Sequence, residues 1–165
     1  MDNRGKDVYV VDFETYMNSL PAKLSEGKRR CDLLMTDGLP HNKIVFCDLC
    51  CYDERLIEPN DSLNMPEGKR ARARQQMAQS LEFLIGIDLL SHNILTFPER
   101  VCLFAFRSYR SPQPPTAAKR GNAKANMLAV LTSPSSVSGQ IITENNVMNH
   151  RFTFVQNKYP NVYNW

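Results

Sequence analysis

Short runs of apolar residues, rich in β-branched and aromatic side chains, recur along the chain and predict β-strands. The first run, residues 7–13 (DVYVVDF), predicts a buried strand. Residues 43–52 (KIVFCDLCCY) predict a second strand, and a short one follows at residues 55–58. Later runs with the same character, separated by turn-forming residues, predict strands at residues 100–109, 126–132, 139–144 and 150–156.

One segment between these runs has the periodicity of an amphipathic helix. Asn64 has the position of an N-cap, Glu67 follows at the spacing of a capping box, and Pro66 suits the first helical turn. Gly86 then weakens or ends the helix. The apolar residues expected to face the core recur at helical spacing: Met77, Leu81, Leu84 and Ile85.

Residues 111–124 have no apolar periodicity and contain three prolines and several small residues. This composition predicts an exposed, flexible loop, made basic by Lys119, Arg120 and Lys124. The whole pattern predicts an α+β fold, with one long amphipathic helix packed on a mainly antiparallel β-sheet and a long flexible Pro-containing loop. The length of 165 residues suits a single domain over residues 1–165.

The composition is typical of a globular intracellular protein. Hydrophobic residues make up 42% of the chain and charged residues 22%, which argues against extensive disorder. No apolar run approaches the roughly 20 residues that span a bilayer. The charged N-terminal segment does not resemble a secretion signal, so the chain is expected not to be secreted. Five cysteines, an odd number, predict reduced thiols in the cytoplasm or nucleus.

Positive charge is concentrated in the second half of the chain. The net charge of +3 divides into −3 for residues 1–90 and +6 for residues 91–165, where Glu99 and Glu144 are the only acidic residues. A basic half favours anionic partners, such as nucleic acid or a ribonucleoprotein, an acidic membrane surface or an acidic protein. Uneven solvation of an ordinary folded surface would give the same asymmetry.

Two groups of basic residues are candidate anion-binding or nucleic-acid-binding sites. The first lies at the start of the predicted helix, where cations are unfavourable against the helix dipole, and where binding of an anion would offset this cost. It comprises Lys69, Arg70, Arg72 and Arg74. The second lies in and beside the predicted loop, next to aromatic residues that suit single-stranded nucleic acid, although a strand would direct them into the core. It comprises Arg107, Arg110, Lys119, Arg120 and Lys124.

One short motif predicts metal-dependent chemistry. Residues 10–15 (VVDFET) resemble the first motif of the DEDD exonucleases, in which alternate strand residues hold divalent metals. The resemblance implies that Asp12 and Glu14 are metal ligands, and residues 91–94 (SHNI) resemble the second motif of the polymerase-linked members. No aspartate follows Asp88, so the last acidic motif of that family is absent.

Cys47 and Cys50 form a CxxC pair, which in other settings holds zinc. On a regular strand the two side chains would point to opposite faces, so buried thiols are the favoured interpretation over a metal site. No cofactor is therefore expected.

The order of a strand, an amphipathic helix, an aromatic-rich strand and a long Pro-containing loop resembles that of the small matrix proteins of rhabdoviruses. This resemblance implies a basic structural protein of the virion that self-associates, coats a ribonucleoprotein and touches the inner membrane leaflet. The sequence thus predicts a non-enzymatic structural or adaptor protein that binds anionic partners through its basic residues. The alternatives are a DEDD-type metal-dependent exonuclease, or a degenerate relative, and a small RNA-binding regulatory or silencing-suppressor protein.

Overall fold

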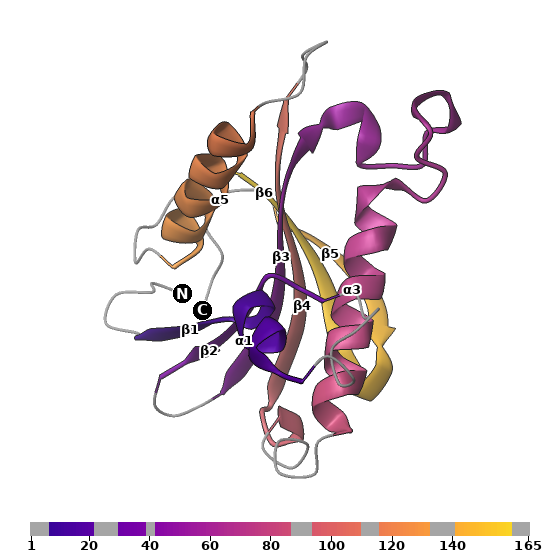
Figure 1. Cartoon of the computed structure of the whole chain (residues 1–165). Coiled ribbons are helices and arrows are strands. Elements are labelled where there is room, and N and C mark those ends of the chain that lie inside the picture. Colours follow the sequence, from indigo (N-terminus) through magenta and orange to yellow (C-terminus); the bar gives the residue numbers. More distant parts are fainter. Residues whose placement is uncertain are drawn as a thin grey trace.

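The computed structural model describes residues 7–21, 30–38, 42–86, 94–109, 116–132 and 141–159, apart from the side chains of residues 119 and 141–149. Its centre is a sheet of six strands in the order β1-β2-β3-β4-β6-β5 (Figure 1). The strands are β1 (Val8–Asp12), β2 (Leu33–Asp37), β3 (Lys43–Asp53), β4 (Glu99–Tyr109), β5 (Ile141–Met148) and β6 (Phe152–Lys158). The helices are α1 (Phe13–Ser19), α3 (Gly68–Ile85) and α5 (Ala117–Leu131).

The sheet is mixed. Antiparallel pairing joins β1 to β2, β2 to β3 and β5 to β6, whereas β3, β4 and β6 run parallel to one another. Parallel neighbours need a crossover, and α3 supplies the one between β3 and β4. Figure 1 shows that α3 and α5 cover opposite faces of the sheet. The described residues therefore form helical layers on both sides of a central sheet.

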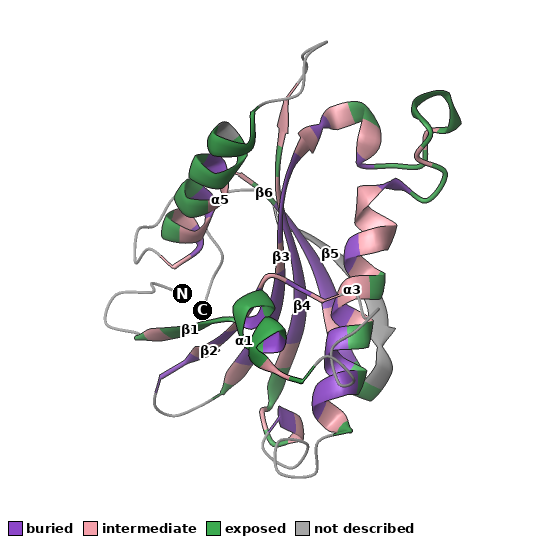
Figure 2. Cartoon of the chain, in the orientation of Figure 1, coloured by how far each residue is buried: buried purple, intermediate pink, exposed green. Residues whose placement is uncertain are grey.

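Alternation along β3 explains why this strand is mostly apolar. Phe46 and Cys50 belong to the core cluster that includes α3, whereas Val45, Cys47 and Leu49 belong to the cluster that includes α5. Both faces of the strand are covered, so both sets of side chains are buried (Figure 2). Cys47 and Cys50 consequently lie on opposite faces, as their spacing predicted.

The predicted α+β class is confirmed, but two features of the predicted fold are wrong. The sheet is mixed rather than mainly antiparallel, because its long central strands are paired in parallel. There is also no single long helix, since α5 covers the face of the sheet opposite α3. The first long helix begins at Gly68, because Asn64 adopts a left-handed conformation (φ 53°) after a short 3-10 turn. It ends at Gly86, as predicted.

The prediction of a flexible loop over residues 111–124 is wrong for its second half. Residues 117–124 are part of α5, and residues 111–115 lie outside the described part of the chain. The strand predicted at residues 126–132 is also wrong, because this segment continues the same helix. Ala123, Met127 and Leu131 recur every fourth residue and are buried against the sheet, which is the helical pattern that the sequence interpretation overlooked.

The strands at residues 43–52, 100–109 and 150–156 are confirmed as β3, β4 and β6, whereas the strand predicted at residues 139–144 is β5, displaced toward the C-terminus. Residues 55–58 are not a strand, because the chain turns through a 3-10 helix, Glu54–Leu56. The first strand forms, but it lies at the sheet edge and is exposed rather than buried (Figure 2), with Tyr9 59% exposed. No helix in the described ranges is long and apolar enough to cross a membrane.

Candidate functional site

A polar opening forms where β2 stops accompanying β3. Pairing between these strands extends only to Cys47, whereas β3 remains paired with β4 as far as Asp53. The second half of β3 therefore has a free edge on the β2 side. At this edge Asp32, the residue just before β2, accepts a hydrogen bond of 2.7 Å from the backbone N–H of Leu49. The carboxylate of Asp32 takes the place that a strand partner would otherwise occupy.

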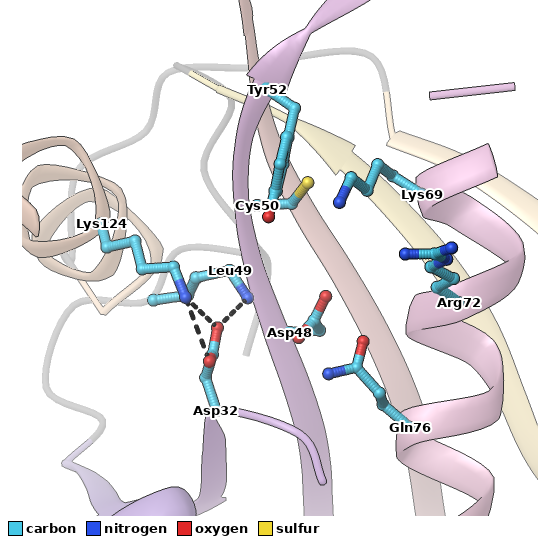
Figure 3. Close-up of a pocket in the computed structure, with 9 residues that line it drawn as sticks. All are labelled: Asp32, Asp48, Leu49, Cys50, Tyr52, Lys69, Arg72, Gln76 and Lys124. Carbon is cyan, nitrogen blue, oxygen red and sulfur yellow. Dashed lines mark hydrogen bonds and ion pairs between the residues drawn. The ribbon is translucent and has the colours of Figure 1, made fainter. Parts of the chain in front are cut away.

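A cavity of about 330 Å³ lies at this edge and receives side chains from elements on both faces of the sheet (Figure 3). In Figure 3, α3 borders it on one side, Lys124 of α5 reaches it from the other, and β3 runs between them. The residues that line it are predominantly polar or charged: Asp32, Asp48, Leu49, Cys50, Tyr52, Lys69, Arg72, Gln76 and Lys124.

Asp48 has an unusual pKa for a carboxyl group. Burial, followed by repulsion from the nearby carboxylate of Asp32, raises the pKa of Asp48 to about 7, although Lys124 and Lys69 act in the opposite direction. The carboxylate of Glu14 also acts on Asp48, and it raises the pKa further. A carboxyl group that titrates near neutral pH in a cavity is a candidate functional group, because bound cations or anions readily change its charge.

Lys124 crosses from α5 to hold Asp32. Its ammonium lies 2.9 Å and 3.1 Å from the two carboxylate oxygens of Asp32. Burial alone would lower the pKa of Lys124, but the ion pair with Asp32 outweighs this effect, and the pKa is raised. The edge of the sheet thus already stabilises one positive charge at Asp32.

Two further cations enter from the first turns of α3. The Lys69 ammonium lies 3.7 Å from the centre of the Tyr52 ring, and within the described part of the chain it has no hydrogen bond or ion pair. The Arg72 Nε is buried without a hydrogen-bond partner among the described residues, although it forms a long ion pair of 3.7 Å with Glu67. Buried donors are normally hydrogen-bonded, so Arg72 has an unused donor beside the cavity.

The remaining basic residues of the two predicted groups do not line the cavity. Arg70 is paired with Glu58 at 2.7 Å, and Arg74 lies over the ring of Phe154. Arg107 lies over the ring of Tyr159, and Arg120 is exposed on α5. Lys119 belongs to α5, but its side chain is outside the described part of the chain, as is the whole of Arg110. The structure therefore brings together Lys69 and Arg72 from the first group and Lys124 from the second.

The geometry assumed for Asp12 and Glu14 is wrong. The chain leaves the strand at Asp12, whose carboxylate accepts a hydrogen bond of 2.8 Å from the Thr15 N–H and thereby caps α1. Glu14 is an exposed residue of the first helical turn, so the two carboxylates do not share a strand face. Residues 91–93 of the second motif lie outside the described residues.

The cysteines form no metal site within the described ranges. All five are buried free thiols, and burial is the main cause that raises the pKa of Cys31, Cys47, Cys50 and Cys102. Among the described residues, no group of three or more His, Cys, Asp or Glu side chains is arranged to hold a metal ion. A divalent cation in the cavity would therefore depend on carboxylates together with water or ligand oxygens.

Sequence reasoning missed the two acids of the cavity. Asp48 interrupts an otherwise apolar strand, and Asp32 stands directly before the short apolar run of β2. An acid within a buried strand needs a special environment, and this was the available signal.

No protein-family model, curated protein or solved structure matches this chain.

Proposed function

We propose that the chain hydrolyses phosphodiester bonds of nucleic acid with the help of a divalent metal ion bound by Asp32 and Asp48. The observation that supports this proposal is the meeting of two carboxylates and three cations in one polar cavity. Mg²⁺ is commonly held by one or two protein carboxylates and completed by water and substrate phosphate oxygens. The carboxylates suit the metal, and the cations suit the phosphate.

Each charged side chain has a role in this reaction. Asp32 and Asp48 would hold the metal ion, which would supply an activated water as the nucleophile and neutralise charge on the phosphate. The proton lost by the water would be balanced by a proton taken up by the leaving oxygen. The ammonium of Lys69 stabilises negative charge as it develops on the phosphate oxygens. Arg72 donates its unused N–H to a phosphate oxygen. Lys124 orients the carboxylate of Asp32 through their ion pair.

The second candidate is binding of an anionic partner without hydrolysis, as in the structural or adaptor protein that the sequence predicts. The cations that line the cavity outnumber the carboxylates, and only two carboxylates line it. A phosphate group could be held by Lys69 and Arg72 alone. In this case the partner would be RNA, a ribonucleoprotein or an anionic membrane, with self-association of the chain.

Removal of the Asp32 charge distinguishes the two candidates. We expect the wild-type protein to cleave a labelled oligonucleotide in Mg²⁺ or Mn²⁺ and not in EDTA, and Asp32→Asn to lose this activity. The control is Asp53→Asn, because Asp53 is on β3 but pairs with Arg55 outside the cavity. Oligonucleotide binding without cleavage in either metal would instead support the second candidate.

Lys69→Met is expected to reduce the cleavage rate by about 10–100-fold. The substitution removes a positive charge that stabilises the negative charge developing on the phosphate oxygens in the transition state. Single-turnover kinetics at saturating metal would measure the effect. Lys43→Met is the matched control, since Lys43 is paired with Glu99 at 2.9 Å and does not line the cavity. Equal rate losses in both variants would contradict the role of Lys69.

A further inference from the structure

We infer that the cavity accepts single-stranded nucleic acid one nucleotide at a time and excludes the double helix. This inference names the substrate of the proposed function and rests on the site assigned there. It follows from where the carboxylates lie: at the free edge of β3, between side chains that arrive from opposite faces of the sheet.

Both sides of the cavity are occupied by helices. Lys124 reaches Asp32 from α5, while Lys69, Arg72 and Gln76 approach from α3 on the other face (Figure 3). Asp48 is partly buried on β3, on the side of the strand that faces Lys69, Arg72 and Gln76, so we expect a phosphate to reach it through the cavity. The rigid backbone of a double helix keeps its phosphates on a broad surface, whereas a single strand can direct one phosphate inward.

The size of the cavity supports the same substrate. Its volume of about 330 Å³ is near the lower end of ligand pockets, about 300–1,000 Å³, and suits one nucleotide rather than a stack of base pairs. Enzymes that act on a nucleotide in such a confined site use single-stranded substrate or extrude the nucleotide from the duplex.

The lining supplies the contacts that single strands use. Tyr52 offers an aromatic ring beside the cations, and proteins that bind single strands combine positive charge with rings on which bases stack. The Lys69 ammonium lies 3.7 Å from the centre of the Tyr52 ring, and we expect it to leave the ring for a phosphate when a base stacks there. The unused Arg72 Nε–H provides a donor for that phosphate.

Fluorescence anisotropy tests the inference. A fluorescein-labelled DNA oligonucleotide is titrated with the protein in Ca²⁺, once as a single strand and once annealed to its complement. We expect at least tenfold tighter binding of the single strand. Tyr52→Ala is expected to weaken single-strand binding by at least fivefold, as loss of one stacking contact does. Tyr52→Phe should retain binding, and Tyr9→Ala should not change it, because Tyr9 is exposed on β1 away from the cavity.

The binding measurement is independent of turnover, so the two proposals can fail separately. Preferential single-strand binding that depends on Tyr52, without cleavage in Mg²⁺ or Mn²⁺, would uphold this inference and overturn the proposed hydrolysis. Binding or cleavage of the duplex equal to that of the single strand would overturn the inference without contradicting the proposed hydrolysis. If Tyr52→Ala does not fold, the affinities of the wild-type protein for the single strand and for the duplex still test the inference.

Discussion

Asp48→Asn is expected to slow metal-dependent hydrolysis strongly and, at the same time, to make the protein more stable above pH 7. The loss of one of the two metal ligands should lower the cleavage rate by about 10²–10³-fold, since a bound metal supplies several kcal/mol of charge stabilisation. The gain in stability follows from the pKa of Asp48, which burial and the neighbouring Asp32 raise to about 7.

The direction in which stability changes with pH follows from the difference between the pKa of Asp48 in the unfolded chain and in the folded protein. In the unfolded chain an aspartate ionises near pH 3.9, but in the folded protein Asp48 keeps its proton up to about pH 7. The stabilising effect of this proton is complete below about pH 4, declines as the unfolded chain ionises, and is lost as the pH rises through 7. An uncharged asparagine removes this decline, and we expect a gain on the order of 2 kcal/mol at pH 8.

Urea unfolding at pH 5 and pH 8 measures this effect, with Asp53→Asn as the control. The pKa of Asp53 is lowered to about 2 by its hydrogen bonds with Arg55, so its replacement should not stabilise the protein at pH 8. Mg²⁺ should stabilise the wild-type protein and leave Asp48→Asn unchanged. If Asp48→Asn is less stable than the wild type at pH 8, the ionised carboxylate of Asp48 does not destabilise the folded protein, which would contradict its raised pKa.

Gly68→Ala is expected to have the largest effect on the fold around the site. Gly68 starts α3 with a φ of +73°, and a Cβ there would lie 2.6 Å from the carbonyl carbon of Glu58 and 2.8 Å from Pro59 N. These are backbone atoms, so the turn or the helix must move. We expect a loss of about 2–4 kcal/mol, which combines the left-handed conformation of a residue with a Cβ and the steric overlap.

The same substitution should also reduce activity, because Lys69 follows Gly68 directly and Arg72 lies one turn further along α3. Gly121→Ala is the matched control: a Cβ at position 121 of α5 meets nothing within 4 Å. It should stabilise the protein by about 0.5–1 kcal/mol, as is usual for this change in a helix. Thermal unfolding of both variants measures the difference, and equal stabilities would show that the turn before α3 accommodates a side chain.

The sequence predicted the strands that are buried on both faces better than any other element. β3 and β4 are mostly apolar in their central parts because α3 covers one face and α5 the other. β1 has the same composition, yet it lies exposed at the sheet edge, since composition does not fix the order of strands. α5 was missed because prolines and small residues before it favoured a loop, although Ala123, Met127 and Leu131 carry the helical spacing.

The candidate site was predictable only in part. Lys69, Arg72 and Lys124 were recognised as candidates for anion binding, but the sequence separates the first two from the third. They meet because helices on opposite faces of the sheet reach the same free edge of β3, which depends on where β2 stops pairing. Asp12 and Glu14 belong to one local motif, whereas Asp48 lies on β3 and Asp32 just before β2, so that only the fold brings these two acids together.

The central claim is that Asp32 and Asp48 together bind a divalent cation in this cavity. Calorimetric titration of Mn²⁺ into the wild-type protein and into Asp32→Asn, Asp48→Asn and Asp53→Asn tests it most directly. We predict one binding site in the wild type and in Asp53→Asn, and its loss in each of the two cavity variants. Equal Mn²⁺ binding by all four proteins, or none by the wild type with or without a bound oligonucleotide, would contradict the claim.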